Sequence, residues 1–160
     1  MTNSTSSLQS YLDDMGVRYR VSHHPTAYTA QMLAEAEHVP GRKVIKPVVV
    51  RADGEFVMCA LPACYRVDLG ELKDQLQAND VQLADEQALA GLFPGCEIGA
   101  APPIGRLYGM TTLMDESLIA DDRVTFQAGT HEDAVTMSLT EYRRVALPEV
   151  AHFGRPMSGS

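Results

Sequence analysis

Hydrophobic residues recur along this chain with two different periods, one typical of helices and the other of strands. Leu8, Leu12 and Met15 fall on one side of a helix that would end at Gly16. Similar spacing recurs further along the chain, although the segments are short. The pattern predicts five helices, at residues 6–15, 29–38, 68–77, 85–92 and 140–146.

Three of these helices begin at residues whose short polar side chains commonly cap a helix, namely Thr29, Asp68 and Asp85. Between the helices lie segments that either alternate strictly or are rich in β-branched residues, and both patterns favour strands. Strands are therefore expected at residues 17–21, 44–50, 56–61, 107–114, 123–127 and 134–138.

The pair Asp53-Gly54 lies between two of these strands and predicts a hairpin turn, because such a turn needs positive φ angles. The strands at 44–50 and 56–61 should then run antiparallel. Hairpins beside helices favour an α+β fold over a doubly wound parallel sheet. We expect a mixed, barrel-like β-sheet surrounded by helices.

The length of 160 residues and the hydrophobic fraction of 45% predict one globular domain over residues 1–160, without a linker. Its ends, at about residues 1–5 and 150–160, are expected to be loosely held. The polar N-terminus does not resemble a signal peptide, and no apolar run is long enough for a membrane helix. Together with an odd number of cysteines, three, this predicts a cytoplasmic protein with reduced thiols and no membrane partner.

The net charge of −8 excludes the broad basic footprint of a nonspecific nucleic-acid binder. A nucleic-acid substrate would have to be held by a local patch. The densest cationic cluster consists of Arg42, Lys43 and Lys46, with Arg51 a little further on. For Arg42 and Lys43 alone, a solvated charged face is an equally good interpretation.

Residues 93–105 contain three prolines and three glycines, a density that neither a helix nor a central strand tolerates. Glycine allows a close approach of the backbone to a ligand, and proline keeps the backbone rigid. Such a loop can present N–H and C=O groups to a carbonyl, an amine or an oxyanion. On composition alone, a simple turn remains the better interpretation. The candidate residues of this loop are Gly99, Ala100, Ala101, Pro102 and Pro103.

Lys46 lies within an apolar predicted strand. It is either an exposed lysine on the wet side of that strand or a cation that faces a pocket and holds a phosphate or carboxylate. Pro47 follows it and removes one ladder donor, which places this part of the strand near an edge or a bulge. His131, in a turn with neighbouring acids, could orient substrate or water, or only shape the turn. The histidines and cysteines do not have metal-binding spacing, so no metal and no cofactor are expected.

Several segments, taken together and in order, resemble the YbaK/EbsC family, the free-standing relatives of the editing domain inserted in bacterial prolyl-tRNA synthetases. The matching segments are the pair His24-Pro25, then VPGRKVIKPVVV with the family lysine at Lys46, then FVMCALPACYRVDL. They are followed by EIGAAPPIG, which contains the Gly-x-x-x-Pro loop from Gly99 to Pro103, and by FQAGTHEDAVTMS.

The resemblance implies a mixed α+β fold and hydrolysis of the ester that joins a mischarged amino acid to the 3′ end of a tRNA. In this family the Gly-x-x-x-Pro backbone fixes the aminoacyl carbonyl and amino group. The lysine positions the terminal adenosine or its phosphate, and a hydroxyl of the tRNA activates water. We take Lys46 and residues 99–103 as catalytic, and assign substrate binding to Tyr28, Lys43, Gly129 and His131.

The function expected is therefore that of a trans-acting aminoacyl-tRNA deacylase. Cysteine, alanine and serine are its candidate amino acids, because synthetic sites reject smaller residues poorly. Its expected partners are a mischarged tRNA, here tRNA-Pro, and a prolyl-tRNA synthetase. The alternative is a non-catalytic module that binds an amino-acid-like ligand or a synthetase; Pro47 and the acidic charge favour it. The oligomeric state is left open.

Overall fold

The helices lie close to where the sequence predicts them. The computed structural model describes residues 4–97 and 99–157. Three short 3-10 turns accompany the helices: η1 (Gly41–Lys43), η2 (Gly105–Tyr108) and η3 (Glu116–Ala120). The α-helices are α1 (Ser4–Asp14), α2 (Ala30–Ala36), α3 (Leu69–Leu76), α4 (Glu86–Leu92) and α5 (Leu139–Ala146).

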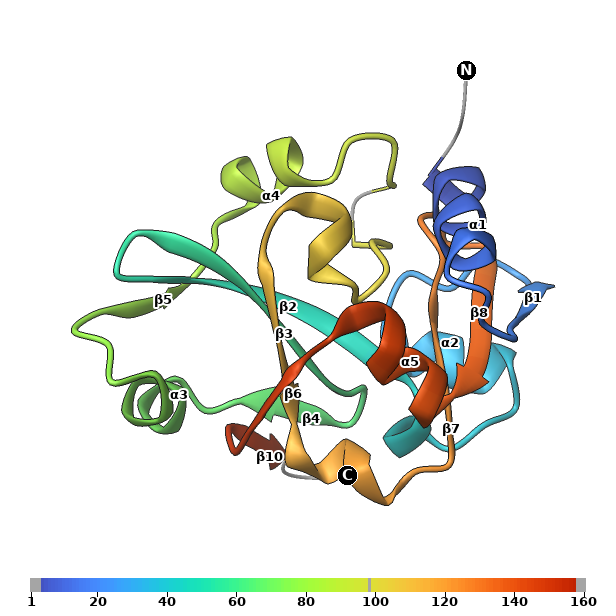
Figure 1. Ribbon diagram of the computed structural model, residues 1–160. Coiled ribbons are helices and arrows are strands. Elements are labelled where there is room, and N and C mark those ends of the chain that lie inside the picture. Colours follow the sequence, from blue (N-terminus) through green and yellow to red (C-terminus); the bar gives the residue numbers. More distant parts are fainter. Residues whose placement is uncertain (1–3, 98, 158–160) are drawn as a thin grey trace.

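The strands form three separate sheets within the described residues (Figure 1). A five-stranded sheet has the order β5-β2-β3-β6-β9, a three-stranded sheet the order β1-β8-β7, and β10 pairs with β4. The mixed α+β class is confirmed, but the sheets do not close into a barrel. The strands are β1 (Arg20–His23), β2 (Ile45–Ala52), β3 (Glu55–Pro62), β4 (Tyr65–Val67), β5 (Val81–Leu83), β6 (Thr111–Asp115), β7 (Arg123–Gln127), β8 (Asp133–Ser138), β9 (Glu149–Ala151) and β10 (Gly154–Pro156).

The hairpin of β2 and β3 is the longest feature of the large sheet. Asp53 and Gly54 turn it with φ angles of 48° and 89°, and the two strands pair antiparallel as predicted. On the other side of β2, β5 pairs only with residues from Val50 onward. Pro47 therefore lies on a stretch of β2 that no named strand borders on that side, consistent with its missing N–H.

The predicted caps are present at all three positions. The side chains of Thr29, Asp68 and Asp85 each accept a hydrogen bond from a backbone N–H in the first turn of their helix. These bonds fix where the polypeptide leaves the preceding loop and enters each helix. For α4 this matters for function, because α4 covers part of the pocket described below.

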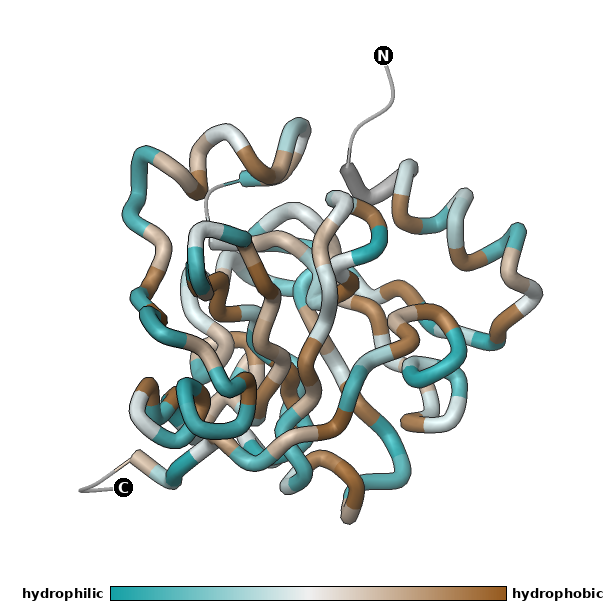
Figure 2. The backbone as a smooth tube through the Cα atoms, turned by 60° about the vertical axis from the view of Figure 1, so that its left-hand side comes forward, coloured by the Kyte–Doolittle hydropathy of each residue, from teal (hydrophilic) through white to brown (hydrophobic). Residues whose placement is uncertain are grey.

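Alternation along β2 divides the apolar residues between two clusters. Val49 packs in a cluster with Met58 and with Leu89 of α4, whereas Val48 and Val50 belong to a cluster with residues of α3. Accordingly, α4 and α3 lie on opposite sides of the hairpin (Figure 1). Figure 2 shows hydrophobic and hydrophilic residues alternating along most of the chain, with hydrophilic stretches in many of the outer turns.

The largest cluster lies on the inner face of the three-stranded sheet. It contains Phe126 and Val135 from the sheet, Leu8 and Leu12 from α1, and Tyr142 from α5, all at most 1% exposed. Burial of this kind supplies the main driving force for folding. Ile104, at the end of the Pro/Gly loop, is part of the same cluster and so ties that loop to the core.

Two predicted strands are displaced. The segment predicted at 17–21 is a strand only from Arg20 onward. The segment 107–114 begins as η2 and becomes β6 only at Thr111, because Gly109, with φ 74°, breaks the extended path. Sequence alternation alone does not report such a left-handed residue.

The sequence predicts a loosely held C-terminal segment from about residue 150, and the structure contains two short strands, β9 and β10, in this segment up to residue 157. Phe153 is fully buried and lies between β9 and β10. The buried carboxylate of Asp115 accepts hydrogen bonds from the N–H groups of Phe153 and Gly154, at 3.0 and 2.6 Å. The outermost residues, 1–3 and 158–160, lie outside the described residues, and one domain over the whole chain stays a prediction.

Candidate functional site

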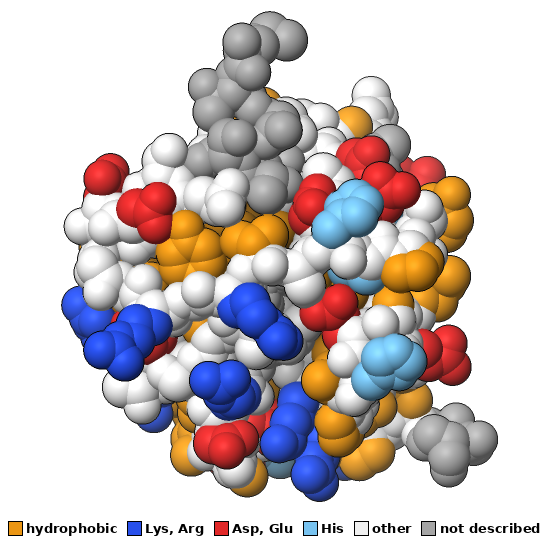
Figure 3. Space-filling view, turned by 90° about the vertical axis from the view of Figure 1, so that its right-hand side faces the viewer, with side chains coloured by type: hydrophobic (Ala, Val, Ile, Leu, Met, Phe, Trp, Pro, Cys, Tyr) orange, Lys and Arg blue, Asp and Glu red, His pale blue; other side chains and the backbone are white. Residues whose placement is uncertain are grey.

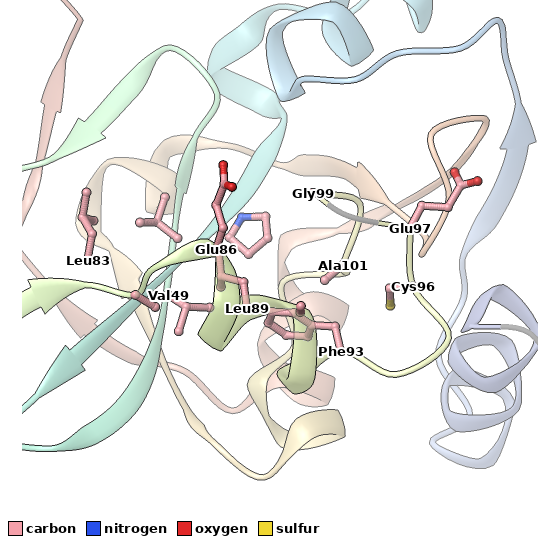
Figure 4. A pocket seen from close by; sticks show the side chains of 13 residues that line it. Val49, Leu83, Glu86, Leu89, Phe93, Cys96, Glu97, Gly99 and Ala101 are labelled. Atoms are coloured by element: carbon pink, nitrogen blue, oxygen red, sulfur yellow. The ribbon is translucent and has the colours of Figure 1, made fainter.

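A pocket of about 470 Å³ opens beside the Pro/Gly loop (Figure 4). Pro47 and Val49 of β2 form one wall, and Leu89 and Phe93, in and just after α4, form another. The remaining lining residues come from β2, β5, the β5–α4 connection, α4 and the loop: Val48, Leu83, Ala84, Glu86, Ala90, Cys96, Glu97, Gly99 and Ala101. A mostly apolar cavity with a few polar groups is typical of a small-molecule site.

The Pro/Gly loop is anchored at several points. Gly99 has φ 83°, in the left-handed region that favours glycine. The N–H of Ala100 donates to Glu97 O at 3.0 Å, and its carbonyl accepts from the N–H of Gly129 at 2.8 Å. The fully buried hydroxyl of Tyr142 donates to the carbonyl of Pro103 at 2.6 Å. The loop is thereby fixed to both β7–β8 and α5.

Gly105 ends the loop at a very close approach. A Cβ at this position would lie 2.5 Å from the carbonyl oxygen of Met110 and 2.7 Å from Oγ1 of Thr112. The Gly105 N–H donates to the same Thr112 hydroxyl at 2.8 Å. This position requires glycine because there is no space for a side chain.

Two residues of the loop keep their backbone polar groups available. Among the described residues, the N–H and C=O groups of Gly99 and Ala101 have no hydrogen-bond partner. These are also the residues of the 99–103 segment that line the pocket. Pro102 and Pro103 have no N–H, and the polar groups of Ala100 are already bonded. The pocket thus has a fixed pair of backbone donors and acceptors at one end.

The turn between β7 and β8 lies against this end of the pocket. A Cβ on Gly99 would lie 3.8 Å from Cε1 of His131, and the His131 ring contacts that of Tyr28 at 5.1 Å between centroids. The Gly129 carbonyl accepts from Glu97 N at 2.8 Å. The structure therefore brings Tyr28, Gly129 and His131 together with the loop, although they do not line the cavity itself.

Lys46 and Lys43 do not line the pocket. Lys46 is half-buried, its Nζ donates to the carbonyl of Ala63 at 3.3 Å, and burial lowers the pKa of its ammonium group. Ala63 belongs to the same small apolar cluster as Ala27, the residue before Tyr28. Lys46 thus faces Ala63 and not the cavity, whose wall is formed in part by the next residue, Pro47.

Lys43 lies in η1 and forms an ion pair with Asp122 at 3.5 Å. With Arg42 it lowers the pKa of Asp121, although burial acts more strongly and raises it. Figure 3 shows Lys and Arg side chains gathered on the lower part of the face that carries β1 and β8, with Asp and Glu among them. Cationic and acidic side chains are therefore mixed on this face, and Lys43 is one of the paired cations.

Most of the residues that line the pocket were not predicted as site residues from the sequence, and Glu97, Phe93 and Cys96 are three of them. Glu97 bonds to the N–H of His131 through Oε1 at 2.6 Å, and Phe93 and Cys96 line the pocket. The Cys96 Sγ lies 3.3 Å from the hydroxyl of Tyr108. The sequence does offer one signal for Glu97, which is the acidic residue next to the Pro/Gly loop. The positions of Phe93 and Cys96 at the pocket depend on how α4 packs, which the local sequence does not indicate.

The fold and this geometry agree with the comparison to known families. A family model of the aminoacyl-tRNA editing domain matches residues 24–145, more than half of the chain. The chain therefore belongs to the aminoacyl-tRNA editing domain family, as its resemblance to YbaK/EbsC proteins predicted. The activity class of this family is hydrolysis of aminoacyl-tRNA.

Among its relatives is the multifunctional Ser/Thr-tRNA deacylase ProXp-y of Escherichia coli (strain K12), which is 25% identical over 150 residues. That match covers 90% of this chain and 89% of the relative. A proline–tRNA ligase of Leuconostoc citreum is 31% identical over 109 residues, or 68% of this chain. The match covers only 19% of the ligase, so this chain corresponds to a small part of that enzyme.

Solved structures support the same fold. One described as a candidate trans-editing enzyme for prolyl-tRNA synthetase superposes with a TM-score of 0.84 at 21% identity. The superposition covers 97% of this chain and 99% of the solved one. At this identity the likeness shows the fold alone.

None of the helices in the described part of the chain has the length and apolar character needed to cross a membrane.

Proposed function

We propose that this chain is a trans-acting deacylase that hydrolyses the ester between a small amino acid and tRNA, with tRNA-Pro as the expected carrier. Serine, alanine and cysteine are the candidates from the sequence. The E. coli relative adds threonine, because its name describes a Ser/Thr-tRNA deacylase. The same proposal includes a prolyl-tRNA synthetase as the partner beside which the chain works.

The single observation that carries the proposal is the pair of unpartnered backbone groups at Gly99 and Ala101, within the described residues, at one end of the pocket. An N–H held rigidly in a partly dry site can stabilise the oxygen that gains charge when water attacks an ester carbonyl. The neighbouring C=O groups can accept from the α-amino group. No side chain has to move to form this arrangement.

In the proposed reaction water attacks the carbonyl carbon of the ester. The bond from that carbon to the ribose oxygen then breaks, and the ribose oxygen takes up the proton released by the water. The products are the free amino acid and a tRNA with a free terminal hydroxyl. The polar side chains lining the pocket are those of Glu86, Cys96 and Glu97. Following the resemblance to the editing family, we assign activation of water to a hydroxyl of the tRNA and not to either of these carboxylates.

Lys46 and Lys43 are proposed to act outside the cavity. Pro47 lines the pocket while Lys46, the residue before it, faces Ala63. A tRNA whose aminoacyl end enters the pocket would extend its last phosphates over the surface, where cations at Lys46 and η1 would position them. Tyr28 and His131 would contact the substrate beside Gly99, outside the cavity itself.

The proposal is tested by incubating the protein with a panel of mischarged tRNAs and measuring release of each amino acid. We expect hydrolysis above background for at least one of serine, threonine, alanine and cysteine. Lys46→Ala should lower the rate by about tenfold or more. Absence of hydrolysis for every small amino acid would contradict the proposal, and an unchanged rate in Lys46→Ala would remove Lys46 from it.

The alternative, a non-catalytic module that binds an amino-acid-like ligand, uses the same pocket. It is favoured by the absence of a lysine, arginine or histidine among the described lining residues. The panel separates the two, because a binding module would retain the ligand or the mischarged tRNA without releasing the amino acid.

A further inference from the structure

Glu97 connects the two segments that form the backbone end of the pocket. Its N–H donates to the Gly129 carbonyl at 2.8 Å, and its own carbonyl accepts from Ala100 N at 3.0 Å. Its side-chain Oε1 accepts from the N–H of His131 at 2.6 Å. Backbone and side chain of a single residue thus hold the loop against the β7–β8 turn.

This arrangement fixes a carboxylate beside Gly99. A free glutamate on a surface loop would sample many rotamers and would lose that freedom on binding a ligand. The bond to His131 removes most of this cost before any substrate arrives. Because Glu97 also lines the pocket, its negative charge is held at the edge of the cavity.

The charge of the pocket lining has one sign. Its ionisable members among the described residues are Glu86, Cys96 and Glu97, without a lysine, arginine or histidine. In Figure 4 the Glu86 and Glu97 side chains lie on either side of Gly99, and the Glu97 carboxylate points toward the β7–β8 turn. Carboxylates repel a phosphate and attract an ammonium group. An aminoacyl ester carries such an ammonium group on the carbon next to its carbonyl.

We propose that Glu97 is a specificity-determining residue that supplies the counter-charge for the α-ammonium group of the aminoacyl ester, while the backbone of Gly99 and Ala101 receives the carbonyl. The inference rests on the proposed function. This role accounts for the position of the Glu97 carboxylate, which is held at the cavity edge by the His131 N–H. An anion fixed there would favour substrates with a free amine. Peptidyl or N-blocked esters would be disfavoured in the same way.

The test compares Glu97→Gln with the wild-type protein on two substrates. Glutamine keeps the size and an oxygen that can accept from His131 N–H, but it removes the charge. On an aminoacyl-tRNA with a free amine, kcat/KM should fall about tenfold, with most of the change in KM, because a charged hydrogen bond is replaced by a neutral one. On the N-acetylated form of the same aminoacyl-tRNA, the two proteins should differ by less than about twofold.

Two further variants make the result specific. Glu132→Gln removes a charge from the same turn, where Glu132 accepts from the Thr26 hydroxyl and does not line the pocket. It should retain the wild-type rate on both substrates. If Glu86→Gln rather than Glu97→Gln shows the tenfold loss, the assignment to Glu97 is overturned. Thermal unfolding of Glu97→Gln should match the wild type, which separates loss of charge from loss of structure.

The outcomes distinguish this inference from the function on which it rests. A wild-type protein that hydrolyses no aminoacyl-tRNA overturns the proposed function. A wild-type protein that hydrolyses one, with Glu97→Gln equally active on it, overturns only the role of Glu97. An equal loss on free and N-acetylated substrates would also overturn that role, because the charge of the amine would then be irrelevant.

Discussion

Removing one hydroxyl from the core should reveal whether the Pro/Gly loop is held by its anchor on α5. Tyr142 is fully buried, and its hydroxyl donates to the carbonyl of Pro103 at 2.6 Å. Burial also raises the pKa of Tyr142, so the hydroxyl remains a donor throughout the neutral and mildly alkaline range. In Tyr142→Phe the Pro103 carbonyl would stay buried without this donor.

The expected magnitude follows from that burial. Leaving a buried acceptor without its partner costs about 1–3 kcal/mol of unfolding free energy. For a chain of this size, each kcal/mol lowers Tm by about 2–4 °C. Because the same bond holds the segment that carries Gly99 and Ala101, deacylation should also fall, by about tenfold or more. Urea unfolding and a mischarged-tRNA assay on the same preparations measure both quantities.

Tyr11→Phe is a matched control. The Tyr11 hydroxyl also donates to a backbone carbonyl at 2.6 Å, that of Val145 in α5, but Tyr11 is half-buried and the bond does not involve the loop. Water can replace it, so the stability loss should be smaller and deacylation should stay within about twofold of wild type. If Tyr142→Phe unfolds like the wild type, or loses stability but not activity, our account of loop anchoring is refuted.

Three further predictions concern other parts of the molecule. Gly105→Ala should lower the unfolding free energy, measured in urea, by about 1–3 kcal/mol, because the new Cβ would clash with the Met110 carbonyl. Gly91→Ala has open space in α4 and should raise it slightly. Equal effects of the two substitutions would contradict the close contact at Gly105. Replacing Arg42 and Lys43 by serine should raise KM for tRNA. It should also make the slope of log(kcat/KM) against log salt shallower by about one for each phosphate that is no longer neutralised. An unchanged slope would exclude Arg42 and Lys43 from phosphate binding. Burial raises the pKa of the Cys59 thiol to about 12. In a thiol-reagent titration at pH 8 this thiol should therefore react only after unfolding. Three fast-reacting thiols in the native protein would contradict this prediction.

Local chemistry made much of the fold predictable. The side chains of Thr29, Asp68 and Asp85 cap their helices as expected, and Asp53-Gly54 turns the hairpin, because each effect depends on residues within one turn of chain. The short strands β4, β5, β9 and β10 were missed for the opposite reason. Each has three residues, and their pairing depends on partners far away in the sequence.

The buried carboxylate of Asp115 illustrates this limit. It accepts hydrogen bonds from the N–H groups of Phe153 and Gly154, which lie far along the sequence from its own strand. A Cβ on Gly154 would lie within 2.8–3.0 Å of the Asp115 carboxyl group, so the contact also depends on glycine at that position. No local pattern around residue 150 indicates such a partner, and the sequence therefore predicts a loose end there.

The candidate site shows the same division. Residue chemistry identified the loop around Gly99, Lys46 and His131 as candidates, and the family resemblance gave them roles and added Tyr28 and Gly129. Neither could place Lys46 on the side of β2 that faces Ala63, or Glu97 at the edge of the cavity. Which way a side chain points from a twisted strand, and which backbone groups remain unpaired, depend on the packing of distant elements.

The anchors of the loop make the path of its backbone independent of the side chains that line the pocket, whereas in most binding loops the two change together. The path of the peptide is set from outside the 100–102 segment, by Gly129, by Tyr142 and by the close contact at Gly105. Of the two alanines in this segment, Ala101 lines the pocket, whereas Ala100 is fully buried outside it. A substitution at Ala101 would therefore change the shape of the cavity, while the backbone that we propose to bind the carbonyl stays where it is. A fold built in this way can acquire new substrates by single replacements, because recognition and chemistry are carried by different atoms of the same short segment.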